Sequence, residues 1–86
     1  MTPRVSVIIP IHNAAAWLAT CLDSILAQSF QEFEIVCIDD ASKDASLSIL
    51  ESYAAKDKRI SVFAFSQNQG SGPARNRGID EAKGEY

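Results

Sequence analysis

The fold is decided by one stretch in the first half of the chain, Glu34-Ile35-Val36-Cys37-Ile38-Asp39-Asp40-Ala41-Ser42-Lys43-Asp44. Its first five residues are mainly apolar and β-branched, which predicts a short buried strand. Two carboxylates follow directly, and the next four residues are typical of turns and helix N-termini. The stretch therefore predicts a buried strand that ends in an acidic loop and leads into a helix.

The same alternation continues on both sides of this stretch. Residues 5–9 predict a strand buried on both faces that stops at Pro10, because proline cannot donate to a sheet ladder. Asn13 then offers an N-cap oxygen to the first helix. Strands are expected at 5–9, 34–38 and 60–65, and helices at 14–28, 47–53 and 74–83. The order β-α-β-α-β-α predicts an α/β fold of three layers, α/β/α, around a parallel sheet.

The composition of the 86 residues is that of one soluble globular domain, residues 1–86. The 8 Lys and Arg residues against 11 Asp and Glu residues give a net charge of −3, which argues against a nucleic-acid partner. No membrane-helix or signal-peptide pattern occurs, so the cytoplasm is the expected location. Cys21 and Cys37 lie in apolar patterns without metal-ligand or redox spacing, which predicts two buried free thiols.

Three loops of unusual composition follow the three predicted strands, at residues 10–13, 39–44 and 68–77. Because the carboxyl ends of parallel strands lie at one edge of a sheet, where such folds bind ligands, we expect these loops to converge on one site. In the second loop, Asp39 and Asp40 are expected to accept hydrogen bonds from N–H or hydroxyl groups of a ligand or from nearby loop amides. The alternative is that Asp40, Ser42 or Asp44 simply caps the next helix. Both roles are compatible, because Asp44 also offers a cap.

The other two loops suggest a nucleotide. The first loop lacks the Gly-x-Gly-x-x-Gly pattern of dinucleotide-binding folds, which argues against an oxidoreductase, and the flat ring of His12 suits a base. In the third loop, Gly70 and Gly72 precede a helix that carries Arg75, an arrangement that suits a phosphate. The alternative interpretation is purely structural. The glycines would then make a flexible connection before a solvated helix face, and His12 would be a structural or surface residue.

Taken in order, these motifs resemble one known family. Residues 5–13 are similar to the opening strand of family-two glycosyltransferases of the GT-A fold, which ends in Pro-x-Tyr-Asn. Residues 34–44 are similar to the stretch of the family that contains Val-Asp-Asp-Gly-Ser-x-Asp. The resemblance continues at 22–28, 68–70, 74–78 and 82–86, so it extends over essentially the whole chain. The chain departs from the pattern in two places, where His12 replaces the usual Tyr and Ala41 replaces the usual Gly, which disfavours a positive φ at Ala41.

The resemblance implies the N-terminal half of a GT-A (Rossmann-like) fold. It also implies transfer of a sugar from a nucleotide-diphosphate sugar, a UDP-sugar, to an acceptor with inversion. Asp40 would accept a hydrogen bond from a ring N–H of the base. The acceptor, a glycan, a lipid-linked sugar or another molecule, is not specified, and the full-length protein would act in the cytoplasm or at the inner face of the membrane. The implied nucleotide contacts are Pro10, His12, Asn13, Asp39, Asp40, Gly70, Gly72 and Arg75.

The resemblance further implies parts that the sequence does not contain. In the family, an Asp-x-Asp motif on the strand after Gly-Glu-Tyr binds Mn²⁺ or Mg²⁺, and the catalytic base lies further on. We therefore expect the metal ligands beyond Tyr86 and no catalytic residue within the chain. The chain would end before that strand and would be inactive alone. It would also be prone to self-association through an uncovered sheet edge. The alternative is a non-catalytic nucleotide-binding or interaction module. A phospho-receiver domain is disfavoured, because Ile9-Pro10 and Phe65-Ser66 occupy the positions of its acids.

Overall fold

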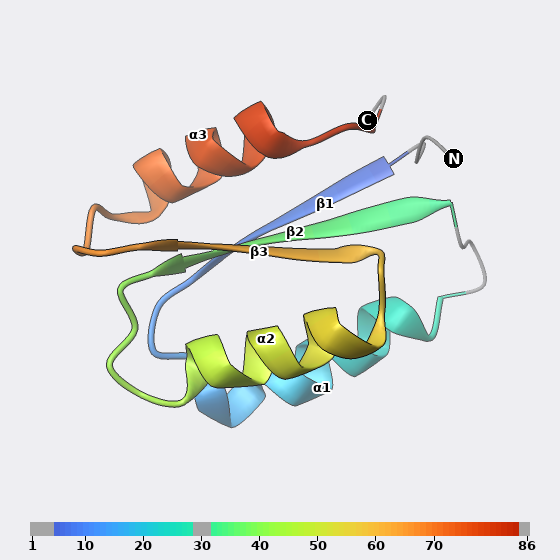
Figure 1. The fold of residues 1–86 in the computed structure, drawn as a ribbon, viewed down its shortest axis with the longest axis horizontal. Coiled ribbons are helices and arrows are strands. Elements are labelled where there is room, and N and C mark those ends of the chain that lie inside the picture. The colour runs from blue at the N-terminus through green and yellow to red at the C-terminus, as the bar shows by residue number, and fades with distance from the viewer. Residues whose placement is uncertain (1–4, 29–31, 85–86) are drawn as a thin grey trace.

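The structure, a computed structural model, describes residues 5–28 and 32–84. Within these residues, strands and helices alternate in the predicted order (Figure 1). The elements are β1 (Val5–Ile11), α1 (Ala15–Leu26), β2 (Phe33–Asp40), α2 (Ser46–Lys56), β3 (Ile60–Phe65) and α3 (Ser71–Glu81). Among the described residues, no helix is both long and apolar enough to cross a membrane.

The strands form one parallel sheet in the order β1-β2-β3. Helices α1 and α2 lie on one face of this sheet and α3 lies on the other, so the predicted three layers are confirmed (Figure 1). β2 is the central strand, and residues 35–40 are all buried, as the apolar run predicted. Residues 5–10 of β1 are only half-buried, because β1 has a neighbouring strand on one side alone among the described residues. The prediction of burial on both faces is therefore wrong for β1.

The sequence predicted that β1 stops at Pro10, but the strand continues through Pro10 to Ile11. The amide of Val5 donates to the carbonyl of Glu32, on the side of β2. Since alternate residues of a strand turn their amides to opposite sides, the missing amide of Pro10 belongs to the side away from β2. Proline is tolerated on such an edge because no ladder hydrogen bond is lost there.

The helix boundaries differ from the prediction at two N-termini. Asn13 was predicted to cap α1, but the N-cap residue is Ala14, and no side chain makes a cap hydrogen bond there. The side chain of Asn13 instead accepts a hydrogen bond from the amide of Lys43. α3 begins at Ser71, three residues before the predicted start, and Pro73 lies in its first turn as expected.

Two apolar clusters hold the layers together. The larger lies between the sheet and α1 and α2, and includes Leu22, Cys37 and Leu50. The smaller lies under α3 and consists of Val36, Ile38 and Ala74, with half-buried neighbours. Burial raises the pKa of the Cys37 thiol to about 12. Cys21 lies on the exposed side of α1, so its predicted burial is wrong.

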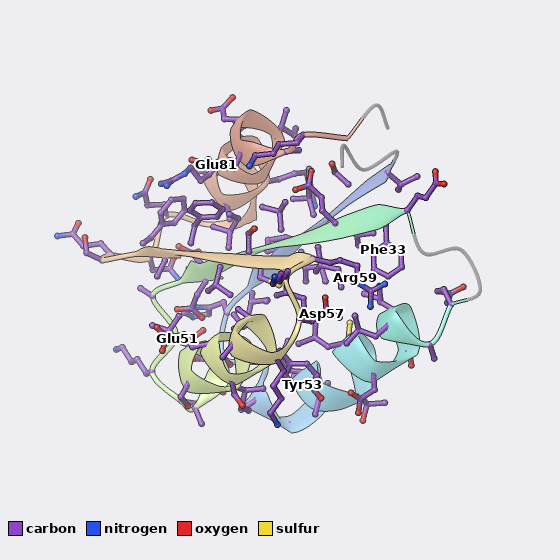
Figure 2. All side chains as sticks on the ribbon, turned by 45° about the vertical axis from the view of Figure 1, so that its right-hand side comes forward. Phe33, Glu51, Tyr53, Asp57, Arg59 and Glu81 are labelled. Atoms are coloured by element: carbon purple, nitrogen blue, oxygen red, sulfur yellow. The ribbon has the colours of Figure 1, made fainter. Side chains whose placement is uncertain are left out.

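The amino ends of the strands are closed by polar and aromatic contacts. Arg59 forms an ion pair with Asp57 at 2.8 Å and lies over the ring of Phe33, 4.7 Å from its centroid (Figure 2). On the side of α3, the Glu34 carboxylate accepts hydrogen bonds from the Ser6 hydroxyl and from the amides of Lys83 and Gly84. These contacts lie at the amino ends of the strands. The described loops that contain the candidate site residues lie at the opposite, carboxyl ends.

Candidate functional site

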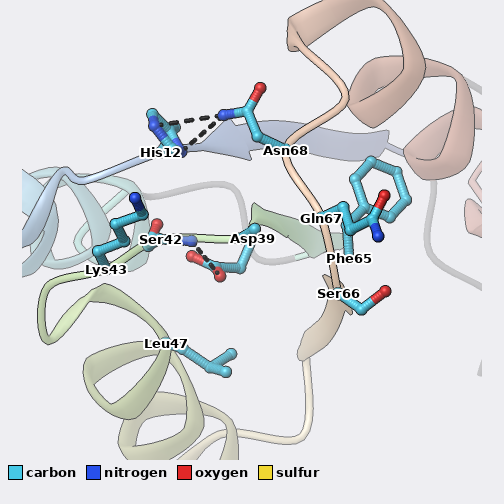
Figure 3. Close-up of a pocket in the computed structure, with 10 residues that line it drawn as sticks. His12, Asp39, Ser42, Lys43, Leu47, Phe65, Ser66, Gln67 and Asn68 are labelled. Carbon is cyan, nitrogen blue, oxygen red and sulfur yellow. Dashed lines mark hydrogen bonds between the residues drawn. The ribbon is translucent and has the colours of Figure 1, made fainter.

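A cavity of about 690 Å³ opens at the carboxyl ends of the strands (Figure 3). A volume of this size is within the usual range for small-molecule sites, about 300–1,000 Å³. All three loops that the sequence singled out contribute to it, so their predicted convergence is confirmed. The lining residues are His12, Asp39, Ala41, Ser42, Lys43, Leu47, Phe65, Ser66, Gln67 and Asn68.

The two adjacent carboxylates of β2 have different surroundings. Asp40 is 4% exposed, and its two oxygens accept hydrogen bonds from the amides of Gln69 (2.7 Å) and Gly70 (2.8 Å). These bonds hold the loop between β3 and α3, where Gly70 has a φ of 93° that glycine adopts without strain. Asp40 therefore acts on the backbone of the loop, and it is not among the residues that line the cavity.

Asp39 lines the cavity and keeps one oxygen without a partner. Its Oδ2 atom accepts a hydrogen bond from the Ser42 amide at 3.1 Å. Its Oδ1 atom is buried and has no hydrogen-bond partner among the described residues. A buried acceptor without a partner costs about 1–3 kcal/mol, and more when it is charged, so this oxygen calls for a hydrogen-bond donor that the described residues do not supply.

The first and second loops are joined by several hydrogen bonds. The amide of Asn13 donates to the Ser42 hydroxyl (2.9 Å), and the Asn13 side chain accepts from the Lys43 amide (2.7 Å). Asp44 accepts from the amides of Ala15 and Ser46, and hydrogen bonding from Ser46 lowers the pKa of the Asp44 carboxyl below its ordinary value. These bonds fix the positions of the two cavity walls relative to each other.

Both loops also contain a residue in the left-handed region of backbone conformation. Asn13 has a φ of 51° and Ala41 a φ of 54°. Asparagine tolerates this conformation, but alanine carries a steric cost of about 1–2 kcal/mol there. The expectation that Ala41 would avoid a positive φ is therefore wrong. Strain of this kind is held in place by the surrounding hydrogen bonds and is typical of functional loops.

The ring of His12 is held at the edge of the cavity. Its Nδ1 atom lies 2.8 Å from the Asp40 carbonyl oxygen, which can only accept, so Nδ1 carries the proton. Its Nε2 atom then accepts from the side-chain NH₂ group of Asn13 at 3.2 Å. The NH₂ group of Asn68 lies 3.2 Å from Nδ1 and 3.3 Å from Nε2, and of these two atoms only Nε2 can accept from it (Figure 3). The ring is therefore fixed in one tautomer and one orientation, with exposed surface next to the cavity.

The structure brings together only part of the predicted site. His12 and Asp39 line the cavity, and Asn13, Asp40 and Gly70 lie directly behind them. Of the other predicted residues, Pro10 lies in β1, and Gly72 and Arg75 are exposed on α3 and do not line the cavity.

Five further residues line the cavity without having been predicted as site residues: Ser42, Lys43, Leu47, Phe65 and Asn68. Three of them could have been found from the sequence. Ser42, Lys43 and Asn68 belong to the loops of unusual composition that follow the predicted strands. Leu47 and Phe65 follow their apolar patterns and carried no separate signal.

The described residues do not suit a divalent metal ion. No group of three or more His, Cys, Asp or Glu side chains among them could hold one. Asp39 and Asp40 are successive residues of a strand and point to opposite faces of the sheet, and both Asp40 oxygens are used by loop amides.

Comparison with known proteins identifies the family. A family model described as glycosyl transferase family 2 matches residues 6–86. The chain belongs to this family. An uncharacterised glycosyltransferase of Haemophilus influenzae is 42% identical over 84 residues, which are 98% of this family 2 chain and 34% of that protein. A poly(ribitol-phosphate) beta-glucosyltransferase of Bacillus spizizenii is 40% identical over 86 residues, which are 96% of the chain and 14% of that protein.

Solved structures share the fold. Staphylococcus aureus TarS 1-349, in complex with UDP-GlcNAc, has a TM-score of 0.88 and 36% identity, over 95% of the family 2 chain and 24% of TarS. The mannosyltransferase PcManGT of Pyrobaculum calidifontis, in complex with GDP-Man and Mn²⁺, has a TM-score of 0.85 and 28% identity, over 95% of the chain and 25% of that protein. The predicted GT-A fold is thereby confirmed. The chain spans about a third or less of the length of all four relatives.

Proposed function

We propose that this chain is the nucleotide-binding portion of a glycosyltransferase, and that its cavity holds the base of a UDP-sugar. The observation that carries the proposal is the buried Oδ1 atom of Asp39, which has no hydrogen-bond partner among the described residues. A ring N–H of the base would supply the missing donor and relieve the cost of an unpaired buried acceptor. His12 offers its exposed ring surface for stacking on the base.

Asp39 and Asp40 have different roles in the proposed site. Asp39 accepts from the base, whereas Asp40 holds the loop that carries Asn68 and Gly70 next to it. The resemblance to the family gave the base contact to Asp40. Both Asp40 oxygens already accept amides, so the oxygen without a partner favours Asp39 for this contact.

A single substitution at Asp39 tests the proposal. In Asp39→Asn, the Ser42 amide needs an acceptor, so the amide oxygen takes the place of Oδ2 and the NH₂ group takes the place of Oδ1. A donor would then face the ring position that is N–H in uracil and a bare nitrogen in cytosine. We expect the variant to bind UDP about 10-fold more weakly, while CDP binding improves relative to UDP.

The measurement is calorimetric titration of UDP, CDP, GDP and dTDP into the chain and its variant. Preference of the wild type for UDP over CDP, reduced in Asp39→Asn, supports the proposal. If Asp39→Asn leaves the UDP to CDP ratio unchanged and Asp40→Asn alters it without changing the fold, the base contact belongs to Asp40. If no nucleotide binds, the proposed function is wrong for this chain.

We place the diphosphate near the N-terminus of α3, as the resemblance implies. The supporting features are the exposed Gly72 and Arg75, and the positive end of the helix dipole. Replacing Arg75 with Gln should weaken UDP and leave uridine binding unchanged, because uridine has no phosphate. Equal loss for both ligands would contradict this placement.

The full transferase would bind a divalent metal and transfer the sugar with inversion. Since the described residues include no suitable metal cluster, we place the metal ligands and the catalytic base elsewhere in the transferase. The same observation favours, as second candidate, a nucleotide-binding module without turnover. We expect no sugar transfer by this chain alone and no effect of Mn²⁺ on its affinity for UDP, and either activity or Mn²⁺-dependent tightening would contradict this.

We also propose the cytoplasm as the location and self-association through β1. Both thiols are free, as expected in a reducing compartment. Among the described residues, β1 has no strand on the side to which Ser6 and Ile8 turn their amides, and an unpaired edge attracts other strands. Light scattering after gel filtration should show a dimer or larger species whose fraction grows with concentration, and a monomer at all concentrations would contradict self-association.

A further inference from the structure

We infer that one exposed flank of α1, formed by Trp17, Cys21 and Ser24, is a docking surface for the same flank of a second copy of this chain. The two copies would be related by a two-fold axis, with β1 beside β1 and α1 beside α1. The inference rests on the self-association through β1 that is proposed above, and it does not depend on nucleotide binding. It adds a second contact surface to the strand edge.

This flank of α1 lies on the side of the molecule where the edge of β1 is open. The hydroxyl group of Tyr53 on α2 donates to the Asp23 carboxylate at 2.7 Å, so Asp23 marks the side of α1 that faces α2. Successive helix residues are rotated by about 100°, which turns Cys21 to the side opposite Asp23, with Trp17 and Ser24 next to it. Since α2 contacts β2 and β3, the side of α1 away from α2 is the side of β1.

The flank is exposed and carries no charge. Trp17 is 69% exposed, more than any other large apolar side chain in residues 5–28 and 32–84. Asp23 is the one charged residue of α1, and it is bonded to α2. Residues 5–11, which form β1, include no charged residue either. Two copies can therefore bring this surface together without opposing like charges, as an interface between identical patches requires.

The opposite edge of the sheet, at β3, is protected by charged side chains. Arg77 lies over the ring of Phe63 on β3, 4.9 Å from its centroid. Glu51 is exposed, and because it is two residues from Tyr53 it lies on the side of α2 that faces away from α1. Two copies that met at β3 would bring their Glu51 carboxylates together, and charged residues are a common protection of sheet edges. The charges therefore favour the side of β1 and α1 for association.

The spacings of strands and helices allow both contacts at once. The larger apolar cluster joins Leu22 of α1 to Cys37 of β2 and to Val7 of β1, so α1 packs on both strands. Two strands are about 9–10 Å wide, and packed helices lie about 8–10 Å apart. If a second β1 continues the sheet, the second α1 therefore lies one helix spacing away from the first, next to the flank.

The test combines light scattering after gel filtration with cross-linking of the 86-residue chain by a short bis-maleimide, which alkylates two thiols. Cys21 is exposed, whereas Cys37 is buried and its raised pKa of about 12 leaves little thiolate, so Cys21 is the reactive thiol. The control moves this thiol to α2 in the double variant Cys21→Ser with Ser52→Cys. Ser52 is exposed, and the α2 helices of the two copies would lie three helix spacings apart, roughly 25–30 Å.

We expect covalent dimers from the wild type and none from the control. Cys21→Asp should raise the dissociation constant of the dimer at least about 10-fold, because it opposes two carboxylates, and Trp17→Ala should do so by losing an apolar contact. Ser52→Asp adds the same charge on α2 and should leave the dissociation constant unchanged. Circular dichroism checks the fold, which should persist because all changed positions are exposed.

The remaining outcomes contradict the inference in distinguishable ways. If the chain forms dimers that do not cross-link through Cys21 and that neither Cys21→Asp nor Trp17→Ala weakens, the inference is overturned and self-association through β1 stands. An equal loss in Ser52→Asp would assign the effect to net charge and also overturn the inference. A monomer at all concentrations would make both the inference and the proposed self-association wrong, while the proposed nucleotide site is tested by its own titrations.

Discussion

The two faces of the sheet are held by different kinds of interaction. On the face of α1 and α2, eight buried apolar side chains form one cluster, with Leu22 and Leu50 fully buried. On the face of α3, only Val36, Ile38 and Ala74 are buried in the cluster. There, two carboxylates contact the segments that flank α3, with Asp40 bound to the loop before it and Glu34 to the residues after it.

This difference shows how the site is built. The α1 and α2 face is stabilised by apolar area removed from water, so it can carry the unpaired oxygen of Asp39 at its end. The α3 face depends on hydrogen bonds between carboxylates and backbone amides, which also define the loop behind the cavity. The first face should therefore respond most to lost volume, and the second to lost hydrogen bonds and to added volume.

The largest effect is expected from a cavity in the α1 and α2 face. Leu22→Ala removes a side chain that is 0% exposed, and should lower the free energy of unfolding by about 3–4 kcal/mol. Urea unfolding followed by circular dichroism measures this change. The control is Ile79→Ala on α3, whose side chain is 57% exposed and should matter by less than about 0.5 kcal/mol. Similar losses in the two variants would contradict the difference between the faces.

The next effect separates the two adjacent acids. Asp40→Ala removes the acceptor of two loop amides and should cost about 2–3 kcal/mol. Asp39→Asn keeps an acceptor for the Ser42 amide and puts a neutral NH₂ group in place of a charged buried oxygen without a partner, which costs less to bury, so the ligand-free chain should be equally or more stable. Urea unfolding of both variants without nucleotide is the measurement. A larger loss for Asp39→Asn than for Asp40→Ala would reverse the roles that the structure gives them.

The sequence predicted the fold well where local patterns decide it. β2 is central, so its apolar run marks a strand buried on both faces without knowledge of the rest. Among residues 5–28 and 32–84, β1 is an edge strand, and whether it ends at Pro10 depends on which side of it lies open, a property of the whole sheet. The start of α3 likewise depends on Asp40, which holds amides 29 and 30 positions further along the chain.

The site was predicted as three converging loops, but the roles within it were not. Strand alternation places Asp39 and Asp40 on opposite faces, and this signal was present in the sequence. Which of the two acids is paired depends on the backbone path of the loop around Gly70, which no local pattern contains. Lys43 belongs to one of the predicted loops, but its exact place on the cavity wall also depends on the positive φ of Ala41, which the sequence disfavoured.

Added volume under α3 should have a moderate effect. A Cβ atom at Gly78 would overlap the Cγ2 atom of Ile8 on β1. Alanine is the better helix former by about 1 kcal/mol, but the overlap should outweigh this gain and leave Gly78→Ala about 1–2 kcal/mol less stable. The double variant Gly78→Ala with Ile8→Val keeps the Cγ2 clash, whereas Gly78→Ala with Ile8→Ala removes it. Urea unfolding measures the stability of each variant. If only the double variant with Ile8→Ala regains the stability lost in Gly78→Ala, the clash lies at the Cγ2 atom of Ile8. A Gly78→Ala variant that is more stable than the wild type would contradict tight packing on this face.

The smallest effect concerns the loop that joins the site to the α1 and α2 face. Ala41 has a φ of 54°, a conformation that costs alanine about 1–2 kcal/mol and glycine almost nothing. Part of the gain is lost because glycine is more flexible in the unfolded chain, so Ala41→Gly should raise stability by about 0.5–1 kcal/mol. Ala19→Gly is the control, since Ala19 is exposed in the interior of α1, where glycine should cost about 1 kcal/mol. Destabilisation by Ala41→Gly as large as by Ala19→Gly would mean that the loop around Ala41 is not strained.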